Sequence, residues 1–307
     1  MVLVREGARG GKQALVGPLR AGGEYGTRRG TVRHSDIIGR AARARVDAVT
    51  AAGAGGRFMV HFPTLAEYVV LCGRQCTPIY PKDAAAIVAM LDAAPGARLL
   101  EAGTGNAGLT MHLARAVGPA GTVFTAERDR ARAEHARQTV ARFRRGALLP
   151  SIAFHVGALG DVVREIVGAA DPQLAARLGG SADEQWRAGG NLVAPLFDGV
   201  VLDMPTPWTQ LPLVFGFLKT DRYAVCYLPN MSQVVELVQR CRPWPLIVED
   251  VVEVDWRSWD VRPAVVRSPE GALAAGEPMV CRPTHTPTGH TAFLVKLRKC
   301  AAHHHQA

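Results

Sequence analysis

A glycine-rich segment at residues 103–108 constrains the fold of this chain more than any other feature. Its sequence, Gly103-Thr104-Gly105-Asn106-Ala107-Gly108, has the spacing G-x-G-x-x-G and directly follows the apolar run 98–102. Glycine is needed where a chain turns sharply after a strand and lets a ligand approach its backbone. A helix expected at 107–117 begins there and offers free N–H groups. The spacing therefore predicts a strand, a ligand-binding loop and a helix.

Two acids near this loop indicate the kind of ligand. Glu127 lies 19 residues beyond Gly108, at the end of the next expected strand. An acid there can bind both hydroxyls of a ribose, although it can also be a merely solvated strand-end acid. Glu101, just before the loop, would repel a pyrophosphate but can hold the ammonium group of a methionine. We therefore predict a nucleoside-containing cofactor and favour S-adenosylmethionine over NAD.

From residue 80 onward, expected strands and helices alternate. Asp83 is predicted to be the N-cap of a first helix at 84–91, and Pro95 and Gly96 are predicted to stop it. The rhythm predicts a parallel α/β sheet in which the last two strands form an antiparallel pair at one end. The segment 169–196 is interpreted as an insertion. Strands are expected at 98–102, 122–126, 152–156, 197–203, 223–228, 246–254 and 291–297, and further helices at 129–144 and 231–240.

The start of the chain has a different character. Short apolar runs separated by glycines, at 14–16, 30–32 and 58–62, predict a small β-barrel or sandwich. Ten Lys or Arg residues against three acids give the first 45 residues +7 of the net charge of +9. Such a segment is typical of either a transit peptide or an RNA-facing module. We predict a small β-rich domain at 1–65, a catalytic domain at 66–300 and a disordered tail at 301–307.

Composition narrows the class of protein. With 48% hydrophobic and 21% charged residues, the chain is an ordinary globular protein rather than a disordered one. No apolar run approaches the ~18–20 residues of a membrane span, and no signal peptide is visible. The spacing of the six cysteines fits neither a zinc site nor a disulfide framework, which predicts free thiols. We expect no metal and no membrane association.

Several ordered blocks make the chain similar to a known family. Residues 99–109 resemble motif I of class I S-adenosylmethionine-dependent methyltransferases. Over roughly 25–299 the chain resembles the tRNA (adenine-58, N1) methyltransferase family, including its mitochondrial and bacterial homotetrameric branches. The resemblance implies an α/β fold with a Rossmann-like seven-stranded sheet and a small N-terminal β domain, with S-adenosylmethionine as cofactor and tRNA as substrate. The blocks are Tyr80-Pro81-Lys82-Asp83, 100–105, 202–208, Tyr227-Leu228-Pro229-Asn230 and 289–294.

The expected reaction suggests roles for individual residues. Methylation at N1 of adenine requires in-line placement and stabilisation of the positive charge that develops on the base. Asp203, at the end of a strand, is the predicted catalytic carboxylate, with Tyr80 and Tyr227 lining the cleft or packing in the core. His290 and Asn230 are predicted to bind the target nucleotide. The predicted cofactor contacts are Gln75, Thr77, Glu101, Gly103, Thr104, Gly105, Asn106, Gly108, Leu109, Glu127, Arg128, Gly157, Ala158 and Asp203.

Other functions remain open at this point. They are methylation of ribosomal RNA, a non-catalytic RNA-binding subunit and an NAD-dependent oxidoreductase, although the intact Gly103, Gly105 and Asp203 argue against a non-catalytic subunit. Because the T-loop adenine must be extruded before it reacts, we expect a basic surface to grip the RNA. The resembling branches imply a homotetramer. The closing block 282–299 implies a mitochondrial location, with the cytoplasm as the alternative. Candidate RNA contacts are Arg28, Arg29, Arg33, Arg128, Arg130, Arg132, Arg144 and Arg145.

Overall fold

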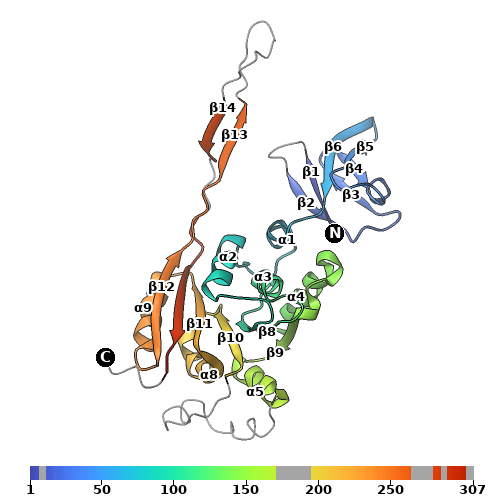
Figure 1. The fold of residues 1–307 in the computed structure, drawn as a ribbon. Coiled ribbons are helices and arrows are strands. Elements are labelled where there is room, and N and C mark those ends of the chain that lie inside the picture. Colours follow the sequence, from blue (N-terminus) through green and yellow to red (C-terminus); the bar gives the residue numbers. More distant parts are fainter. Residues whose placement is uncertain (7–11, 171–194, 264–278, 285–288, 302–307) are drawn as a thin grey trace.

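A seven-stranded sheet forms the centre of the molecule, seen in a computed structural model that describes residues 1–6, 12–170, 195–263, 279–284 and 289–301 (Figure 1). The strand order is β12-β15-β11-β10-β7-β8-β9. All neighbouring pairs are parallel except those that β15 makes with β11 and β12. The strands are β7 (Arg98–Ala102), β8 (Thr122–Glu127), β9 (Ile152–Val156), β10 (Phe197–Leu202), β11 (Leu218–Leu228), β12 (Leu246–Glu253) and β15 (Phe293–Lys299).

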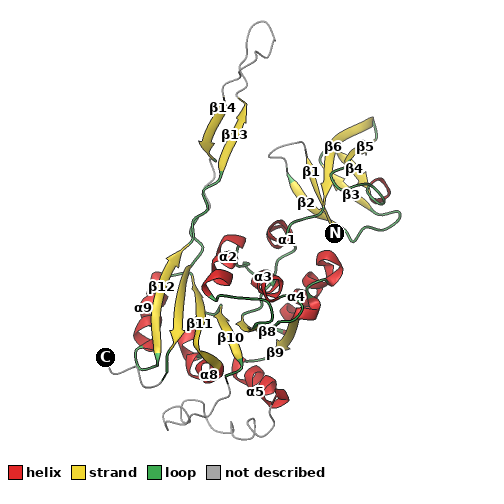
Figure 2. Ribbon diagram, viewed as in Figure 1, coloured by secondary structure: helices red, strands yellow, loops and turns green. Residues whose placement is uncertain are grey.

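Helices cover both faces of this sheet, so its central strands are buried on both sides (Figure 2). Side chains alternate along β10: Val200 and Leu202 pack in one core cluster, and Val201 packs in the other. Continuous burial of this kind is expected for a parallel sheet between two helical layers. One layer holds α2 (Pro81–Met90), α3 (Gly108–Val117) and α4 (Arg130–Arg142), and the other holds α5 (Leu159–Ala170), α8 (Leu211–Phe217) and α9 (Met231–Cys241).

The N-terminal segment forms one six-stranded antiparallel sheet with the order β2-β1-β6-β5-β4-β3. Val4, Val46 and Phe58 are among the residues of its separate core. The strong β character was predicted, but the second sheet of a sandwich is not seen among the described residues. The strands are β1 (Val2–Glu6), β2 (Gln13–Val16), β3 (Glu24–Thr27), β4 (Gly30–Arg33), β5 (Arg45–Thr50) and β6 (Gly53–His61), followed by α1 (Leu65–Leu71).

The start of the first sheet-covering helix differs from its prediction. Tyr80 is the N-cap of α2, and Pro81 occupies the first helical position, where its missing N–H and fixed φ are favourable. Asp83 lies inside the first turn and is fully buried, so its predicted N-cap role is wrong. The sequence rule failed because Asp83 binds the adjacent Lys82 side chain rather than a backbone N–H.

The last two strands of the large sheet pair antiparallel, as predicted, but β15 also pairs with β11. It therefore lies inside the sheet, and β12 forms the edge. Between them the chain forms an unpredicted hairpin of β13 (Trp259–Pro263) and β14 (Met279–Pro283), which projects away from the sheet (Figure 1). Most of the predicted insertion at 169–196 lies outside the described residues.

All six cysteines are free thiols, as their spacing predicted. Within the part of the chain that the structure describes, no helix is long and apolar enough to cross a membrane.

Candidate functional site

The glycine-rich loop follows β7 and lies directly against the end of β10. Gly103 has φ +98°, and a Cβ built on it would lie 2.3 Å from the carbonyl oxygen of Asp203. The Asp203 N–H donates to the carbonyl oxygen of Ala102 at 2.9 Å. Gly105 also has a positive φ, +54°. The loop thus needs glycine at 103 both for its backbone conformation and for the close approach of the two strand ends.

The carboxylate of Glu101, which precedes the loop, is buried. Glu101 is only 1% exposed, and its Oε2 accepts hydrogen bonds from the hydroxyls of Thr110 at 2.6 Å and Thr125 at 2.7 Å. Burial raises the pKa of Glu101 to about 7, against the lowering effect of these two bonds. The three residues belong to β7, α3 and β8, so the carboxylate joins the elements from which the loop emerges.

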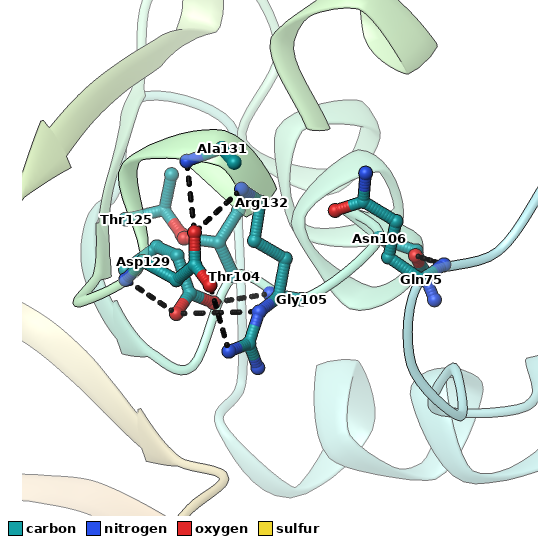
Figure 3. A network of polar contacts seen from close by, with 9 residues as sticks. Gln75, Thr104, Gly105, Asn106, Thr125, Asp129, Ala131 and Arg132 are labelled. Atoms are coloured by element: carbon teal, nitrogen blue, oxygen red, sulfur yellow. Dashed lines mark hydrogen bonds and ion pairs between the residues drawn. The ribbon is translucent and has the colours of Figure 1, made fainter. Parts of the chain in front are cut away.

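Glu127, at the end of β8, connects the loop to the start of α4. Its Oε2 accepts from the Gly105 N–H and its Oε1 from the Asp129 N–H, both at 3.1 Å. The Nε of Arg132 lies 3.8 Å from Oε1. Asp129 caps α4 by accepting from the N–H groups of Ala131 and Arg132 (Figure 3). The nearly buried Glu127 is therefore held in place rather than freely solvated.

The side chain of Asn106 binds the backbone of residues 75 and 76 to the loop. Its Oδ1 accepts from the Gln75 N–H at 2.8 Å (Figure 3), and its Nδ2 donates to the carbonyl oxygen of Cys76. The Sγ of Cys76 lies 3.0 Å from the position that a Cβ on Gly105 would take. Gln75 therefore approaches the loop through its backbone, while Thr77 is exposed two residues further along.

A cavity of about 270 Å³ opens beside these residues. Five of the predicted cofactor contacts line it: Gly103, Glu127, Arg128, Gly157 and Asp203. The other lining residues are Ala102, Ala126, Arg132, Leu159, Met204, Pro205, Thr206, Thr209 and Gln210. Glycine at 103 and 157, an acid at the end of β8 and a second acid at the end of β10 suit a ligand with polar groups at both ends.

The surroundings of Asp203 change the pKa of its carboxyl group. No side-chain hydrogen bond to its carboxylate exists within the described residues. Burial, together with the nearby charge of Glu127, raises the pKa of Asp203 to about 7. The carboxylate is consequently a stronger proton and hydrogen-bond acceptor than an ordinary surface aspartate, and its ionised form becomes dominant only above that pH.

The backbone that follows Asp203 is held by α9. Gln233 Nε2 donates to the carbonyl oxygen of Pro205 at 3.0 Å. Asn230 and Gln233 form a reciprocal capping box at the start of α9. Asn230, predicted to bind the substrate, therefore stabilises the helix that positions the Asp203 loop.

A buried polar cluster around Lys82 lies beside Tyr227, because Thr291 interacts with the side chains of both residues. Lys82 Nζ donates to Asp83 at 2.9 Å, to the carbonyl oxygen of Val254 at 2.7 Å and to the hydroxyl of Thr291 at 2.5 Å. Burial raises the pKa of Tyr227 above its ordinary range, and the charges of Asp83 and Asp203 add to this. Tyr80 also acts electrostatically on Tyr227, although it lines a different pocket, beside Lys82 and Trp256.

His290 joins two segments near this cluster. Its Nδ1 lies 2.6 Å from Glu253 Oε1, and its Nε2 lies 2.8 Å from the carbonyl oxygen of Pro229. Both partners are acceptors, and the bonds to them raise the pKa of His290. A contact from His290 to a substrate would require one of these two bonds to be exchanged.

The remaining predicted contacts have structural surroundings. The Thr104 hydroxyl lies 2.6 Å from that of Thr125, and Gly108 packs against Val69, whose Cγ1 would lie 3.1 Å from an added Cβ. Leu109 belongs to the apolar core, and Ala158 is exposed at the turn into α5. Within the described ranges, no group of three His, Cys, Asp or Glu side chains is arranged to hold a metal ion.

Sequence reasoning did not assign Thr206, Thr209 or Gln210 to the cavity, and it considered Arg132 only as an RNA contact. The sequence carried a signal for the first three, because they follow closely on Asp203 in a proline-rich turn. The position of Arg132 depends on its ion pair with Glu127.

Comparisons with known proteins agree on the type of molecule. The family described as the tRNA methyltransferase complex GCD14 subunit matches residues 63–158. The tRNA (adenine(58)-N(1))-methyltransferase TrmI of Thermus thermophilus is 37% identical over 294 residues, which cover 96% of this chain and 95% of that one. The catalytic subunit TRM61 of the corresponding enzyme of Eremothecium gossypii is 26% identical, over 83% of this chain and 60% of that one.

Two solved structures share the fold. A SAM-dependent O-methyltransferase from Thermotoga maritima has a TM-score of 0.72 at 21% identity and covers 98% of this chain and 92% of that one. The tRNA (m1A58) methyltransferase TrmI of Aquifex aeolicus has a TM-score of 0.68 at 22% identity, with 98% and 97% covered. The predicted class I methyltransferase fold is confirmed.

Proposed function

Since this chain belongs to the tRNA (adenine(58)-N(1))-methyltransferase family, we propose that it methylates N1 of adenine 58 in tRNA with S-adenosylmethionine as donor. The observation that carries this proposal is the cavity that brings the glycine loop, Glu127 and the Asp203 carboxylate together. When bound, S-adenosylmethionine supplies an electrophilic methyl group. The side chains around the cavity then hold the donor and the base.

The residues present fit this cofactor. Gly103 and Gly105 both have a positive φ, and the Asp203 carbonyl oxygen and the Cys76 Sγ lie where their Cβ atoms would be, so the loop beside the cavity requires glycine at both positions. Glu127 Oε1 and Oε2 already accept backbone N–H groups, and each oxygen has a further lone pair for a ribose hydroxyl. Asp203, which lies against Gly103 in the same lining, offers negative charge toward a cationic group of the ligand.

Asp203 has the properties that the reaction needs. N1 of neutral adenine has a lone pair, and its methylation leaves a positive charge on the base. A nearby carboxylate stabilises that charge as it develops and can accept a hydrogen bond from the N6 amino group. Because Asp203 has no competing side-chain partner among the described residues, its carboxylate is available for the base. We also propose that Tyr227, which is buried and close enough to feel the charge of Asp203, borders the bound base.

The direct test uses purified protein, an unmodified tRNA transcript and radiolabelled S-adenosylmethionine. We expect label in the tRNA and a primer-extension stop at position 58. A transcript with guanine at position 58 is the matched control, because it changes one base only, and guanine N1 carries a hydrogen and has no free lone pair to attack the methyl group. Label that persists in the control transcript, or that enters only ribosomal RNA, would contradict the proposal.

We further propose that the protein works as a homotetramer. The projecting hairpin and the edge strand β12 expose apolar side chains, among them Trp259, Val261 and Met279 on the hairpin, each more than half exposed, and Ile247 on β12. An isolated two-stranded hairpin is marginally stable in water, and exposed apolar groups of this size are typical of association surfaces. A second copy of the chain would cover them.

Light scattering of the purified protein tests this proposal. We expect a tetrameric mass for the wild type and a smaller mass for the double variant Trp259→Ser/Val261→Ser, because it removes apolar surface from the hairpin. Ile38→Ser is the matched control, since Ile38 is 48% exposed but lies in the N-terminal domain. A monomeric wild type would refute the homotetramer.

The mitochondrial location of the protein stays a prediction.

A further inference from the structure

A second, larger cavity of about 760 Å³ lies between the N-terminal sheet and the end of α4. It shares no lining residue with the cavity that holds Asp203. Its size is within the range of small-molecule sites. The two domains meet here through packed side chains, because Leu15 of the N-terminal sheet packs against a core cluster that includes Tyr68 and Phe143. The cavity is therefore a feature of the interface between two folded domains.

The lining of this cavity is positively charged and contains no acid. Arg142, the last residue of α4, and Arg144 and Arg145, just after it, contribute to the lining, and all three are exposed. None of the three forms an ion pair within the described residues. Three unneutralised guanidinium groups at one site favour an anionic ligand, and guanidinium is the side chain best suited to phosphate.

The backbone that carries two of these arginines is strained. Arg144 has φ +45° and Arg145 has φ +60°, and Gly146 continues the left-handed turn with φ +78°. Two consecutive non-glycine residues in this conformation are unfavourable. Glycine would be the better residue for stability at both positions, so the presence of arginine calls for a role of the side chains themselves.

Apolar and aromatic groups complete the cavity. Phe62 is 68% exposed and lies with Pro63, Pro18 and Leu19 in the lining. Arg144 lies over the Phe143 ring, 5.4 Å from its centroid, which leaves its N–H groups free at the edge of the guanidinium plane. An exposed phenylalanine beside guanidiniums without an acidic partner is the combination that binds unstacked nucleotides, because the base stacks on the ring and the phosphate pairs with the cation. A protein partner with acidic side chains would use the arginines but would not need the exposed ring beside them.

We propose that this interdomain cavity is a second RNA-contact site, which binds an unstacked nucleotide of the tRNA together with its flanking phosphates. The inference rests on the proposed function, because it names the surface by which the same enzyme holds its substrate outside the catalytic centre. Phe62 stacks on the base, and Arg142, Arg144 and Arg145 bind the phosphates. The left-handed turn directs the last two arginines to the cavity.

The test compares tRNA affinity, its salt dependence and protein stability in three variants. For Arg144→Gly/Arg145→Gly we expect weaker tRNA binding and a salt dependence of log K that is shallower by about 0.7–0.9 for each phosphate that the variant no longer binds. The melting temperature should stay the same or rise, because glycine relieves the left-handed strain. Phe62→Ala should weaken binding by roughly 5-fold or more with an unchanged salt slope, because stacking is not ionic.

Arg43→Gly is the matched control, since Arg43 is an exposed arginine with φ +70° that does not line the cavity. It should leave tRNA affinity at the wild-type value. If the wild type methylates tRNA and both cavity variants bind tRNA as it does, the inference is overturned and the proposed function stands. If the wild type neither binds nor methylates tRNA, both fail. If tRNA affinity falls equally in the Arg43 variant, the loss reflects the net charge of the protein rather than this cavity, and the inference is also overturned.

Discussion

Replacing Asp203 by Asn should lower the rate of methyl transfer at saturating substrates by about 10²–10³-fold. The substitution keeps the shape of the side chain but removes the negative charge that stabilises the developing cation. Cofactor binding should change far less, because the loop glycines and Glu127 remain. Single-turnover transfer to tRNA measures the rate, and calorimetric titration with S-adenosylhomocysteine measures binding.

The pH dependence gives this prediction an internal control. With the pKa of Asp203 raised to about 7, the wild-type single-turnover rate should rise with pH through that value as the carboxylate ionises. The residual rate of Asp203→Asn should lack this step. A variant that transfers methyl groups at the wild-type rate would remove Asp203 from the mechanism.

The same substitution has an expected consequence for stability. An ordinary unfolded aspartate has a pKa of about 3.9, so between that pH and about 7 the folded protein binds more protons at Asp203 than the unfolded chain does. The contribution of this carboxyl group to stability therefore falls as pH rises through this window and stays unfavourable above it. Asp203→Asn should consequently melt at a higher temperature than the wild type at pH 8, although it transfers methyl groups much more slowly.

Replacing Gly103 by Ala should damage both the fold and the cofactor site. The new Cβ would lie 2.3 Å from the Asp203 carbonyl oxygen, and a backbone atom at the end of a buried strand cannot easily move. Strain and displacement together should cost about 2–4 kcal/mol of stability. Cofactor affinity should fall by roughly tenfold or more, since a loss of about 1.4 kcal/mol already has that effect.

The variant Gly96→Ala is a control that separates the effect of a positive φ from the effect of the clash with Asp203. Gly96 also has a positive φ, +87°, but nothing lies within 4 Å of its added Cβ. This control should lose only about 1–2 kcal/mol and should bind S-adenosylhomocysteine as the wild type does. Thermal unfolding and titration of both variants provide the comparison. Equal losses in the two variants would show that the contact with Asp203 has no special importance.

Local patterns predicted the catalytic core well for a physical reason. The bounds of β7 and β9 match the predicted runs 98–102 and 152–156, because each run is short and lies between turn residues, with Pro and Gly before or after it. The glycine loop and Glu127 were recognisable because the spacing of these residues in the sequence is itself the signal. The six short strands of the N-terminal sheet were harder to delimit, because glycine and arginine interrupt their apolar pattern.

Contacts between segments that are far apart in the chain could not be predicted from the sequence. Asp83 was assigned as an N-cap from its neighbours, but its burial with Lys82 depends on Thr291, 209 residues beyond Lys82. His290 was assigned to the substrate, while the structure gives both of its ring nitrogens protein partners. The hairpin β13–β14 was missed because each strand has only five residues, and its apolar side chains, such as Trp259 and Val261, are exposed rather than packed in a core.

By itself, the sequence determined the class of fold, the cofactor loop and the acid at the end of β10, because each is encoded by residues close together in the chain. Only the tertiary structure decided the charge state and setting of that acid, since burial and the field of Glu127 raise the pKa of Asp203. It also brought Phe62 and the left-handed Arg144 and Arg145 to one cavity. Such properties arise from groups that meet only after folding, when low dielectric and close packing act on them together.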